Sequence, residues 1–417
     1  MNRSFAGLIA LLLLALSAVG IAQQQRGVSV PVIVVFEEAT DFSGFENSYR
    51  ADDRAQDNPA AWNYQDRGVA GFVQELERGR GFRADFVYSR ALKGFAARLS
   101  AQQIADLEND PRVAYVELDG PVSIDQRGKK PGGGGGGGST GQTTPWGIDK
   151  IDADLSSTVA GNGSGTIDNV RAYIIDTGVD ATHPDLNVIA HINFAGGQDL
   201  DCHGHGTHVG GTVAARDNTQ DVVGVAPGAP LVGVKVLNCQ GSGTISGVIA
   251  GVDWVTGNAV KPAIANMSLG GGASPALDTA VIASANSGVF YSVAAGNSGA
   301  NACNSSPARA GTTDGVMTTA AIDINDNEAS WSNFGNCVDI WAPGVSILST
   351  KRGGGTTTMS GTSMAAPHVG GGGVLHLLSH SAASAAYVEG ELKSAAAQTS
   401  KVSKDGRAIV RLNVGGY

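Results

Sequence analysis

The sequence predicts an α/β fold, a doubly wound and mostly parallel sheet, with a small α+β domain ahead of it. From Pro145 to Tyr417, continuous apolar runs alternate with glycine-rich turns and helical stretches, as in parallel sheets covered on both faces. Apolar residues make up 42% and charged residues only 16% of the 417 residues, which suffices for a large core. An uninterrupted glycine run, Gly132–Gly138, separates this part from a shorter α/β pattern before it.

Residues 1–22 have the pattern of a secretory signal peptide. Arg3 supplies a positive start, Leu8–Val19 is apolar, and Gly20-Ile-Ala22 ends the run with small residues. The alternative is an uncleaved anchor, which the length of the apolar run disfavours because it is too short to span a bilayer well. We therefore expect a secreted protein, extracellular or periplasmic, without a membrane partner.

Residues 30–125 are expected to form the small domain. Ser100 and Gln103 make a capping box, in which each side chain can satisfy a free backbone N–H at the start of a helix, and Pro111 closes that helix. The predicted elements are strands at Val32–Phe36, Ala91–Leu99 and Val113–Glu117, with helices at Val69–Arg78 and after Ser100.

Residues 126–144 are expected to be a linker. Its glycine run is flanked by Lys129 and Lys130, a composition that is flexible and easily cut. The segment is either a spacer or a processing site, and the two interpretations are compatible.

Residues 145–417 are expected to form the doubly wound domain, whose ligands should bind beyond the carboxyl ends of the strands. The predicted strands are Val170–Ile175, Leu231–Leu237, Ala263–Leu269 and Val289–Ala294, and the predicted helices include Ser246–Thr256 and Ser274–Ser287.

Charge and cysteine content narrow the function. The net charge is −10 and there is no basic stripe, so nucleic acid is not an expected partner. The four cysteines, at positions 202, 239, 303 and 337, allow three pairings, between which the sequence alone does not choose. An oxidising destination favours disulfides over a thiolate metal site.

Four motifs at strand ends or helix starts carry reactive side chains. Asp176 ends a buried strand, His205 opens a helix among glycines, Ser363 lies at the start of another helix, and Asn297 follows a strand. Each has an ordinary structural interpretation as a turn former, core histidine, helix cap or turn amide. Together they supply what a serine nucleophile needs: a base, a carboxylate to orient that base, and donors for an oxyanion.

The motifs Asp176-Thr-Gly178, His205-Gly-Thr-His-Val209 and Gly361-Thr-Ser-Met-Ala-Ala-Pro-His368 resemble those of the subtilisin-like serine proteases. Within that family, Pro145-Trp-Gly-Ile-Asp-Lys-Ile-Asp152 and Asn301-Ala-Cys-Asn-Ser-Ser-Pro-Ala-Arg309 are similar to the proteinase K and aqualysin branch. The resemblance implies a serine endopeptidase in which Asp176 orients His205, His205 is general base and then acid, and Ser363 forms an acyl-enzyme. Asn297 matches the oxyanion-hole asparagine.

The resemblance also implies a substrate cleft, in which glycine-rich edges pair with an extended peptide and a pocket without charge selects apolar side chains. Its residues would be Gly241, Ser242, Gly243, Ser268, Leu269, Gly270, Ala294, Ala295 and Gly296.

Residues 30–125 resemble the inhibitory propeptide of the same family. The implied protein is a monomeric zymogen that cuts polypeptides, is inhibited by its own propeptide, and processes itself between Gln126 and Thr144.

Further expectations from the resemblance are the disulfides Cys202–Cys239 and Cys303–Cys337. No cofactor is expected for catalysis. A structural calcium ion is expected at Asp149, Asp152 and Asp326, although Ala153 stands where a ligating side chain is usual.

Two other functions are compatible with parts of the sequence. His203, His205 and His208 could be metal ligands of a metallohydrolase, which leaves Ser363 and Asn297 without a role. An inactive homologue could act as a binding module, although all four catalytic positions are filled. One departure from the family is the run Gly370–Gly373 after Ser363, which puts the rigidity of that helix in doubt because glycine disfavours helix.

Overall fold

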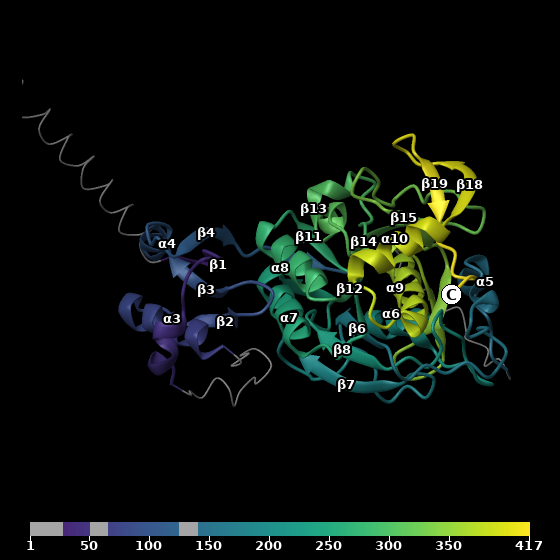
Figure 1. Ribbon diagram of the computed structural model, residues 1–417, viewed down its shortest axis with the longest axis horizontal. Helices are drawn as coiled ribbons and strands as arrows, with labels where there is room; N and C mark the ends of the chain where they lie inside the picture. Colours follow the sequence, from purple (N-terminus) through teal and green to yellow (C-terminus); the bar gives the residue numbers. More distant parts are fainter. Residues whose placement is uncertain (1–27, 51–65, 125–140) are drawn as a thin grey trace, which may run out of the picture. The chain divides into compact units, whose positions relative to one another are not determined.

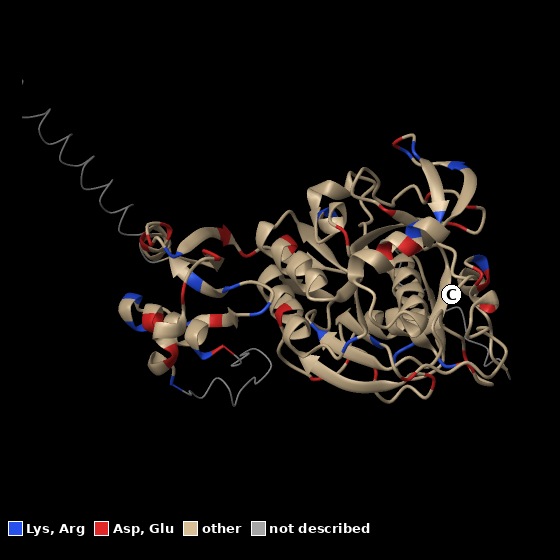
Figure 2. Cartoon of the chain, in the orientation of Figure 1, with Lys and Arg blue, Asp and Glu red and all other residues tan. Residues whose placement is uncertain are grey.

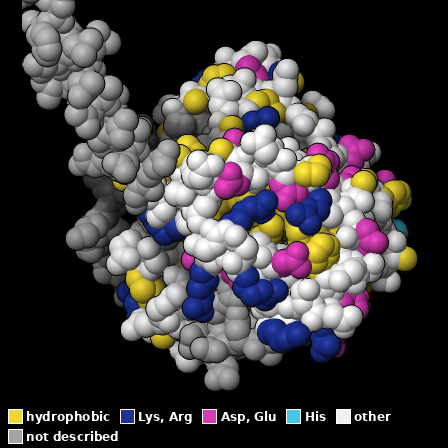
Figure 3. Space-filling view, turned by 90° about the vertical axis from the view of Figure 1, so that its left-hand side faces the viewer, with side chains coloured by type: hydrophobic (Ala, Val, Ile, Leu, Met, Phe, Trp, Pro, Cys, Tyr) yellow, Lys and Arg dark blue, Asp and Glu magenta, His cyan; other side chains and the backbone are white. Residues whose placement is uncertain are grey.

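The computed structural model describes residues 28–50, 66–124 and 141–417, which form two compact units (Figure 1). The first unit holds the described residues before position 120 except 90–92, and the second unit holds 90–92 and everything from Gly120 onward. The predicted signal peptide and most of the predicted linker lie outside the described residues. Charged residues of both signs are spread along the chain of each unit (Figure 2). On the face shown in Figure 3, side chains of both signs are exposed.

The first unit is a four-stranded antiparallel sheet in the order β2-β3-β1-β4, with two α-helices. Three strands and both helices follow the predictions. The predicted strand Ala91–Leu99 begins only at Gly94, because the N–H groups of Arg90 and Ala91 each donate to Asp253 Oδ1 at 2.7 Å. The elements are β1 Ser29–Phe36, β2 Ala84–Tyr88, β3 Gly94–Ser100, β4 Val113–Leu118, α3 Arg67–Arg80, α4 Ala101–Glu108 and a 3₁₀ helix at Ser43–Ser48.

The predicted capping box opens α4. Ser100 Oγ accepts from the N–H of Gln103, and Gln103 Oε1 accepts from the N–H of Ser100 at 2.8 Å. The core of this unit is aromatic: Phe36 and Phe72 have ring centroids 5.0 Å apart, and Phe36 and Phe95 are 5.8 Å apart. The small domain therefore has its own apolar centre.

The second unit contains a nine-stranded sheet in the order β18-β19-β15-β14-β12-β10-β6-β8-β7. Every neighbouring pair is parallel except β18 and β19. The prediction of a mostly parallel sheet is confirmed. The strands are β6 Arg171–Asp176, β7 Val188–Asn193, β8 Leu231–Lys235, β10 Ala263–Met267, β12 Val289–Ala294, β14 Val316–Ile322, β15 Ile340–Pro343, β18 Ala397–Val402 and β19 Ala408–Arg411.

Helices cover both faces of this sheet, as β12 shows. Phe290 lies against Gly373 of α9, whereas the next residue, Tyr291, donates from its hydroxyl to Ser284 of α8 at 2.8 Å. Since successive strand side chains point to opposite faces, α8 and α9 lie on opposite sides. The α-helices are α5 Trp146–Lys150, α6 His205–Ala214, α7 Ile245–Asn258, α8 Pro275–Asn286, α9 Thr362–Ser379 and α10 Ala385–Ala395, with 3₁₀ helices at Ala153–Leu155, Ala302–Asn304 and Ala308–Thr312.

The glycine run does not interrupt α9, which continues to Ser379. A Cβ at Gly371 would lie 2.4 Å from Val225 Cβ, and one at Gly373 would lie 2.6 Å from Phe290 Cδ1. The glycines are thus needed for close approach of this buried helix to its neighbours, and packing compensates for their low helix propensity.

Both disulfides expected from the resemblance are present. Cys202 is bonded to Cys239 and Cys303 to Cys337. The first ties the segment before α6 to the turn after β8, next to the residues described below. Within the part of the chain that the structure describes, no helix is both long enough and apolar enough to cross a bilayer.

Candidate active site

Asp176 is the last residue of β6 and is fully buried at the carboxyl edge of the sheet. Its Oδ1 accepts from the N–H of Thr177 at 2.7 Å. The Asp176 carboxylate therefore lies at the carboxyl edge of the sheet, where ligands of parallel sheets bind, and the N–H of Thr177 fixes its orientation.

His205 is the first residue of α6 and is also fully buried. Its Nδ1 lies 2.8 Å from Oδ1 and 3.0 Å from Oδ2 of Asp176. Gly206 makes this approach sterically available, since a Cβ there would lie 2.0 Å from Gly178 O and 3.2 Å from the Asp176 side chain. With Nδ1 bonded to a carboxylate, the imidazole presents Nε2 as its reactive atom, and Nε2 has no hydrogen-bond partner among the described residues.

Ser363 lies in the first turn of α9 and is buried. Its Oγ donates to the carbonyl of Ser268 at 3.1 Å, and Ser268 Oγ donates to the Ser363 carbonyl at 2.8 Å. Pro367 explains the second bond: it has no N–H to complete the helical bond to Ser363 O, so a side chain satisfies that carbonyl instead.

Helices α6 and α9 pack against each other. The starts of both lie at the carboxyl edge of the sheet, because His205 bonds to Asp176 at the end of β6 and Ser363 bonds to Ser268 directly after β10. Within the described residues, no hydrogen bond joins Ser363 Oγ to His205 Nε2. The carboxylate–imidazole half of the predicted triad is therefore formed, whereas the serine hydroxyl is turned to Ser268. Catalytic hydrogen bonds are often long before substrate binds.

Asn297 follows β12 and is fully buried. Its Oδ1 accepts from the N–H of Thr362, the residue before Ser363, at 2.8 Å. The N–H of Gly296 in turn donates to Thr362 Oγ1 at 3.0 Å. The amide is thus locked to the start of the serine-bearing helix, which fixes the direction of its NH₂ group.

Two of the segments predicted to line a substrate cleft contribute strands to a four-stranded sheet in the order β13-β11-β5-β9. Its strands are β5 Pro121–Ser123, β9 Ser242–Thr244, β11 Gly270–Gly272 and β13 Ser305–Ser306. Strand β5 lies between the two glycine-rich edges and is antiparallel to both, with Val122 opposite Gly243 and Gly271. The N–H of Ile124 then donates to Gly241 O at 2.9 Å.

The glycines of this cleft leave room for the strand between them. A Cβ at Gly271 would lie 2.7 Å from Pro121 O. A pocket of about 200 Å³ opens beside β5 and is lined by small uncharged residues, which include three of the predicted pocket residues. Its lining is Ser123, Gly270, Gly271, Ala294, Ala295, Gly296, Ser298, Ser305, Ser306 and Ala308.

The three histidines weighed as metal ligands have different partners. His205 is bonded to Asp176, and His208 Nε2 lies 3.1 Å from the carbonyls of Ile347 and Thr357. Burial lowers the pKa of His208 to about 3. The rings of His203 and His205 are 6.4 Å apart at their centroids. Within the described residues, no group of three His, Cys, Asp or Glu side chains is placed to hold a metal ion.

Two of the three expected calcium ligands, Asp152 and Asp326, have partners of their own. Asp326 bonds to Lys150 Nζ at 3.0 Å and to Arg411 Nη1 at 3.0 Å, and Asp152 accepts from the side chain of Asn413. Calcium at this place would require Asp326 to exchange two cations for the ion, so the calcium site stays a prediction.

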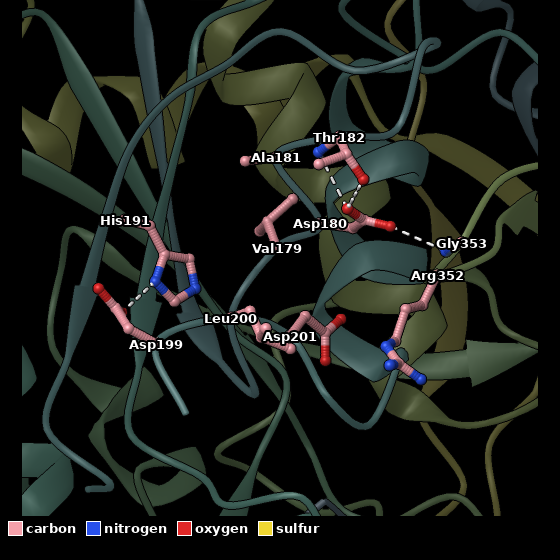
Figure 4. A pocket seen from close by; sticks show the side chains of 10 residues that line it. All are labelled: Val179, Asp180, Ala181, Thr182, His191, Asp199, Leu200, Asp201, Arg352 and Gly353. Atoms are coloured by element: carbon pink, nitrogen blue, oxygen red, sulfur yellow. Dashed lines mark hydrogen bonds and ion pairs between the residues drawn. The ribbon is translucent and has the colours of Figure 1, made fainter. Parts of the chain in front are cut away.

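Two buried charges beside the site were not singled out as functional in the sequence. Lys235 ends β8, and Asp201 precedes α6. A lysine inside the apolar run Leu231–Leu237 is a signal that could have been followed, because lysine is rarely buried without a specific reason. Asp201 also lines a pocket of about 520 Å³, together with Val179, His191 and Arg352 (Figure 4).

Comparison with known proteins gives two family matches. Residues 168–412 match the subtilase family, and residues 31–125 match the peptidase inhibitor I9 family. The first match covers the nine-stranded sheet and all four reactive side chains.

Several characterised relatives are similar over most of this chain. Alkaline serine exoprotease A of Vibrio alginolyticus is 43% identical over 358 residues, which cover 81% of this chain and 62% of that protein. The extracellular serine proteinase of Thermus sp. (strain Rt41A) is 44% identical over 308 residues, covering 71% and 69%. This chain spans less than two thirds of the length of the Vibrio protein.

A solved structure shares the fold. The crystal structure of a cold adapted subtilisin-like serine proteinase superposes with a TM-score of 0.58 at 41% identity, covering 66% of this chain and 99% of the other. Together with the two family matches, this similarity shows that the chain belongs to the subtilase family of serine proteases and carries an I9 propeptide domain ahead of its peptidase domain.

Proposed function

We propose that this chain is the precursor of a secreted serine endopeptidase that cleaves polypeptides through Asp176, His205 and Ser363. The observation that carries the proposal is the buried Asp176–His205 hydrogen bond of 2.8 Å, at the sheet edge where the first turn of α9 holds Ser363. Subtilase membership supports the same reaction class.

The geometry supports the following roles. Asp176 accepts from Nδ1 of His205, which fixes the imidazole tautomer and leaves Nε2 able to take a proton. Substrate binding would draw the Ser363 hydroxyl from Ser268 O toward Nε2, a rotation about one side-chain bond. Ser363 Oγ then attacks the peptide carbonyl, His205 protonates the leaving amine, and water hydrolyses the acyl-enzyme.

The negative oxygen of the tetrahedral intermediate would be stabilised by the NH₂ group of Asn297 and the backbone N–H of Ser363. The bond from Thr362 N–H to Asn297 Oδ1 supports this role, because it orients the amide before substrate arrives. Donors that are fixed in advance stabilise developing charge without reorganisation.

The cleft supports cleavage within polypeptides. Strand β5 is an internal segment with chain on both sides, and it pairs with β9 and β11 through backbone groups. Such pairing gives affinity with little demand on sequence. The uncharged pocket favours small or apolar side chains before the cleaved bond.

The same strand supports inhibition of the precursor by its own propeptide. Val122 is buried, and the Ile124 N–H to Gly241 O bond is the last described contact of the segment that fills the cleft. We therefore expect self-cleavage among the residues that follow Ile124, in or directly before the region 126–144. Until that segment leaves, substrate has no access to β9 and β11.

Export is proposed from the signal-peptide pattern of residues 1–22 and from the two disulfides, which are stable in oxidising compartments. The Thermus relative is named an extracellular proteinase.

A serine-directed organofluorophosphate tests the proposal. The processed enzyme should lose its activity on casein, and peptide mass spectrometry should find one adduct, on Ser363. A chelating agent alone should leave the active-site chemistry intact at low temperature. An inactivated enzyme that carries its adduct elsewhere, or full casein hydrolysis by Ser363→Ala, would disprove the assignment.

A further inference from the structure

Lys235 is only 1% exposed and stands directly beside the catalytic carboxylate, since it pairs in register with Asp176 on the neighbouring strand. Its Nζ donates to the carbonyls of Thr177 at 2.9 Å and Leu237 at 2.8 Å, and lies 3.7 Å from Sγ of Cys202. Burial lowers the pKa of Lys235, and the nearby carboxylates of Asp201 and Asp176 oppose that change. A buried ammonium needs such compensation, because desolvation of a charge is costly.

Asp201 is the opposite charge and is likewise 1% exposed. Its Oδ1 accepts from the Thr177 hydroxyl at 3.0 Å and from the N–H groups of His203 and Gly204 at 3.0 and 2.8 Å. Its Oδ2 accepts from the N–H of Thr207 at 3.0 Å and from the Thr207 hydroxyl. All of these donors are neutral. Of the carboxylates that raise the pKa of the buried Lys235, that of Asp201 acts most strongly, so the two opposite charges can offset each other.

Thr177 joins the two charges to the catalytic pair. Its N–H holds Asp176 Oδ1, its carbonyl accepts from Lys235, and its hydroxyl donates to Asp201 and accepts from the Gly206 N–H at 2.9 Å. Asp201 also holds Gly204 and Thr207, which flank His205 at the start of α6. Both catalytic residues are therefore tethered to this one network.

We propose that Lys235 and Asp201 are a balanced pair of buried charges that positions Asp176 and His205 and sets the charge balance around them. Neither touches substrate, so both are positioning residues. The inference rests on the proposed function, because it assumes that His205 is the base whose protonation controls the rate.

The pair makes opposite contributions at His205. A buried ammonium disfavours a second positive charge on the imidazole, whereas a buried carboxylate favours it. His205 also faces Asp176, His203 and His208, and the pocket next to Asp201 is lined by Asp180, His191, Asp199 and Arg352 (Figure 4). Because those groups stay unchanged in the test below, the contributions of Lys235 and Asp201 can be separated from theirs.

The test is the acid limb of the pH profile of kcat/KM, measured on processed enzyme with a short chromogenic peptide. Lys235→Met removes a positive charge and leaves the negative charge of Asp201 unbalanced, so it should move the acid limb to higher pH, by about one unit. Asp201→Asn leaves Lys235 unbalanced and should move the limb to lower pH by a similar amount. The double variant should return the limb to the wild-type position, and Lys235→Arg should leave it there.

A purely structural role would lower the height of the profile without moving it, since the position of a limb does not depend on how much enzyme is active. Lys393→Met is the matched control. It removes an exposed lysine that forms ion pairs with two buried carboxylates, those of Asp339 and Glu389, on α10 and the loop before β15. That variant should lose thermal stability and keep the wild-type limb.

If Lys235→Met does not accumulate as processed enzyme, the shift of the acid limb is measured on Asp201→Asn alone. The pH dependence of self-processing is then measured on the precursor of Lys235→Met, in place of the peptide assay. The inference would be overturned if the acid limb of kcat/KM did not move in either single variant, or moved in the same direction in both. The proposed function would still stand in that case, provided that Ser363→Ala is inactive. An active Ser363→Ala would instead remove the proposed function, whatever the limbs do.

Discussion

Asp176 and Asp326 are two acidic residues to which the sequence assigns a role, and the structure gives them opposite surroundings. Asp176 is fully buried and bonds to a backbone N–H and an imidazole, whereas Asp326 is partly exposed and bonds to Lys150 and Arg411. A carboxylate held by an imidazole can stabilise the positive charge that appears on it during a reaction. A carboxylate matched by two cations has its charge already neutralised and serves the fold.

The largest expected effect is that of replacing Asp176. Asp176→Asn should lower kcat by about 10⁴-fold, because the amide no longer fixes the reactive tautomer of His205. Steady-state kinetics on a peptide substrate measure it, with circular dichroism to show a folded protein. A loss of less than about tenfold would mean that Asp176 does not orient the base.

The next largest effect concerns the oxyanion donor. Asn297→Ala should lower kcat by about 10²- to 10³-fold, with little change in KM, because the donor acts mainly in the transition state. The variant also loses the bond to Thr362 N–H, so Asn297→Asp, which keeps an acceptor for that N–H, is the matched control. Both variants should be slow; an active Asn297→Asp would show that only the acceptor matters.

A third prediction addresses the packing beneath the site. Gly373→Ala should lower the free energy of unfolding by about 1–3 kcal/mol, because the new Cβ would lie 2.6 Å from Phe290. Gly390 of α10 is the control, since a Cβ there meets nothing within 4 Å. Gly390→Ala should raise the free energy of unfolding by up to about 1 kcal/mol, through helix propensity alone. Thermal denaturation with the activity blocked compares the two, and an equal gain in both would refute the packing argument.

These packing and pairing effects mark where prediction from sequence ends. Periodicity found β12 with its observed bounds, and the capping box located the start of α4. Periodicity did not predict β2 or β5. Strand β5 was missed because it is three residues long, begins with Pro121 and pairs with short glycine-rich strands, none of which has the alternating pattern of a strand. The four proposed reactive side chains could be picked out because each lies in a short local motif.

What the sequence could not show depends on residues far apart in the chain. The partners of Asp326 lie 176 and 85 residues away, and the carbonyl that accepts from Ser363 Oγ lies 95 residues away. Likewise, whether glycine weakens α9 depends on Val225 and Phe290, which only the folded chain brings close.

The smallest expected effect is that of replacing Asp326, the ion-paired carboxylate. Asp326→Asn should lower the free energy of unfolding by about 1 kcal/mol and leave kcat/KM unchanged, because its ion pairs are partly exposed. The same variant sharpens the calcium prediction. If calcium displaces Lys150 and Arg411 from Asp326, a chelating agent should lower the melting temperature of the wild type more than that of the variant; equal shifts would place any calcium elsewhere.

The most direct test of the account is N-terminal sequencing of the secreted protein, with and without Ser363→Ala. The account predicts that the wild type begins among the residues that follow Ile124, whereas Ser363→Ala retains residues 30–124 on one uncut chain. Efficient processing of Ser363→Ala at the same bond, in a host without other proteases, would contradict the claim that Ser363 cuts its own chain.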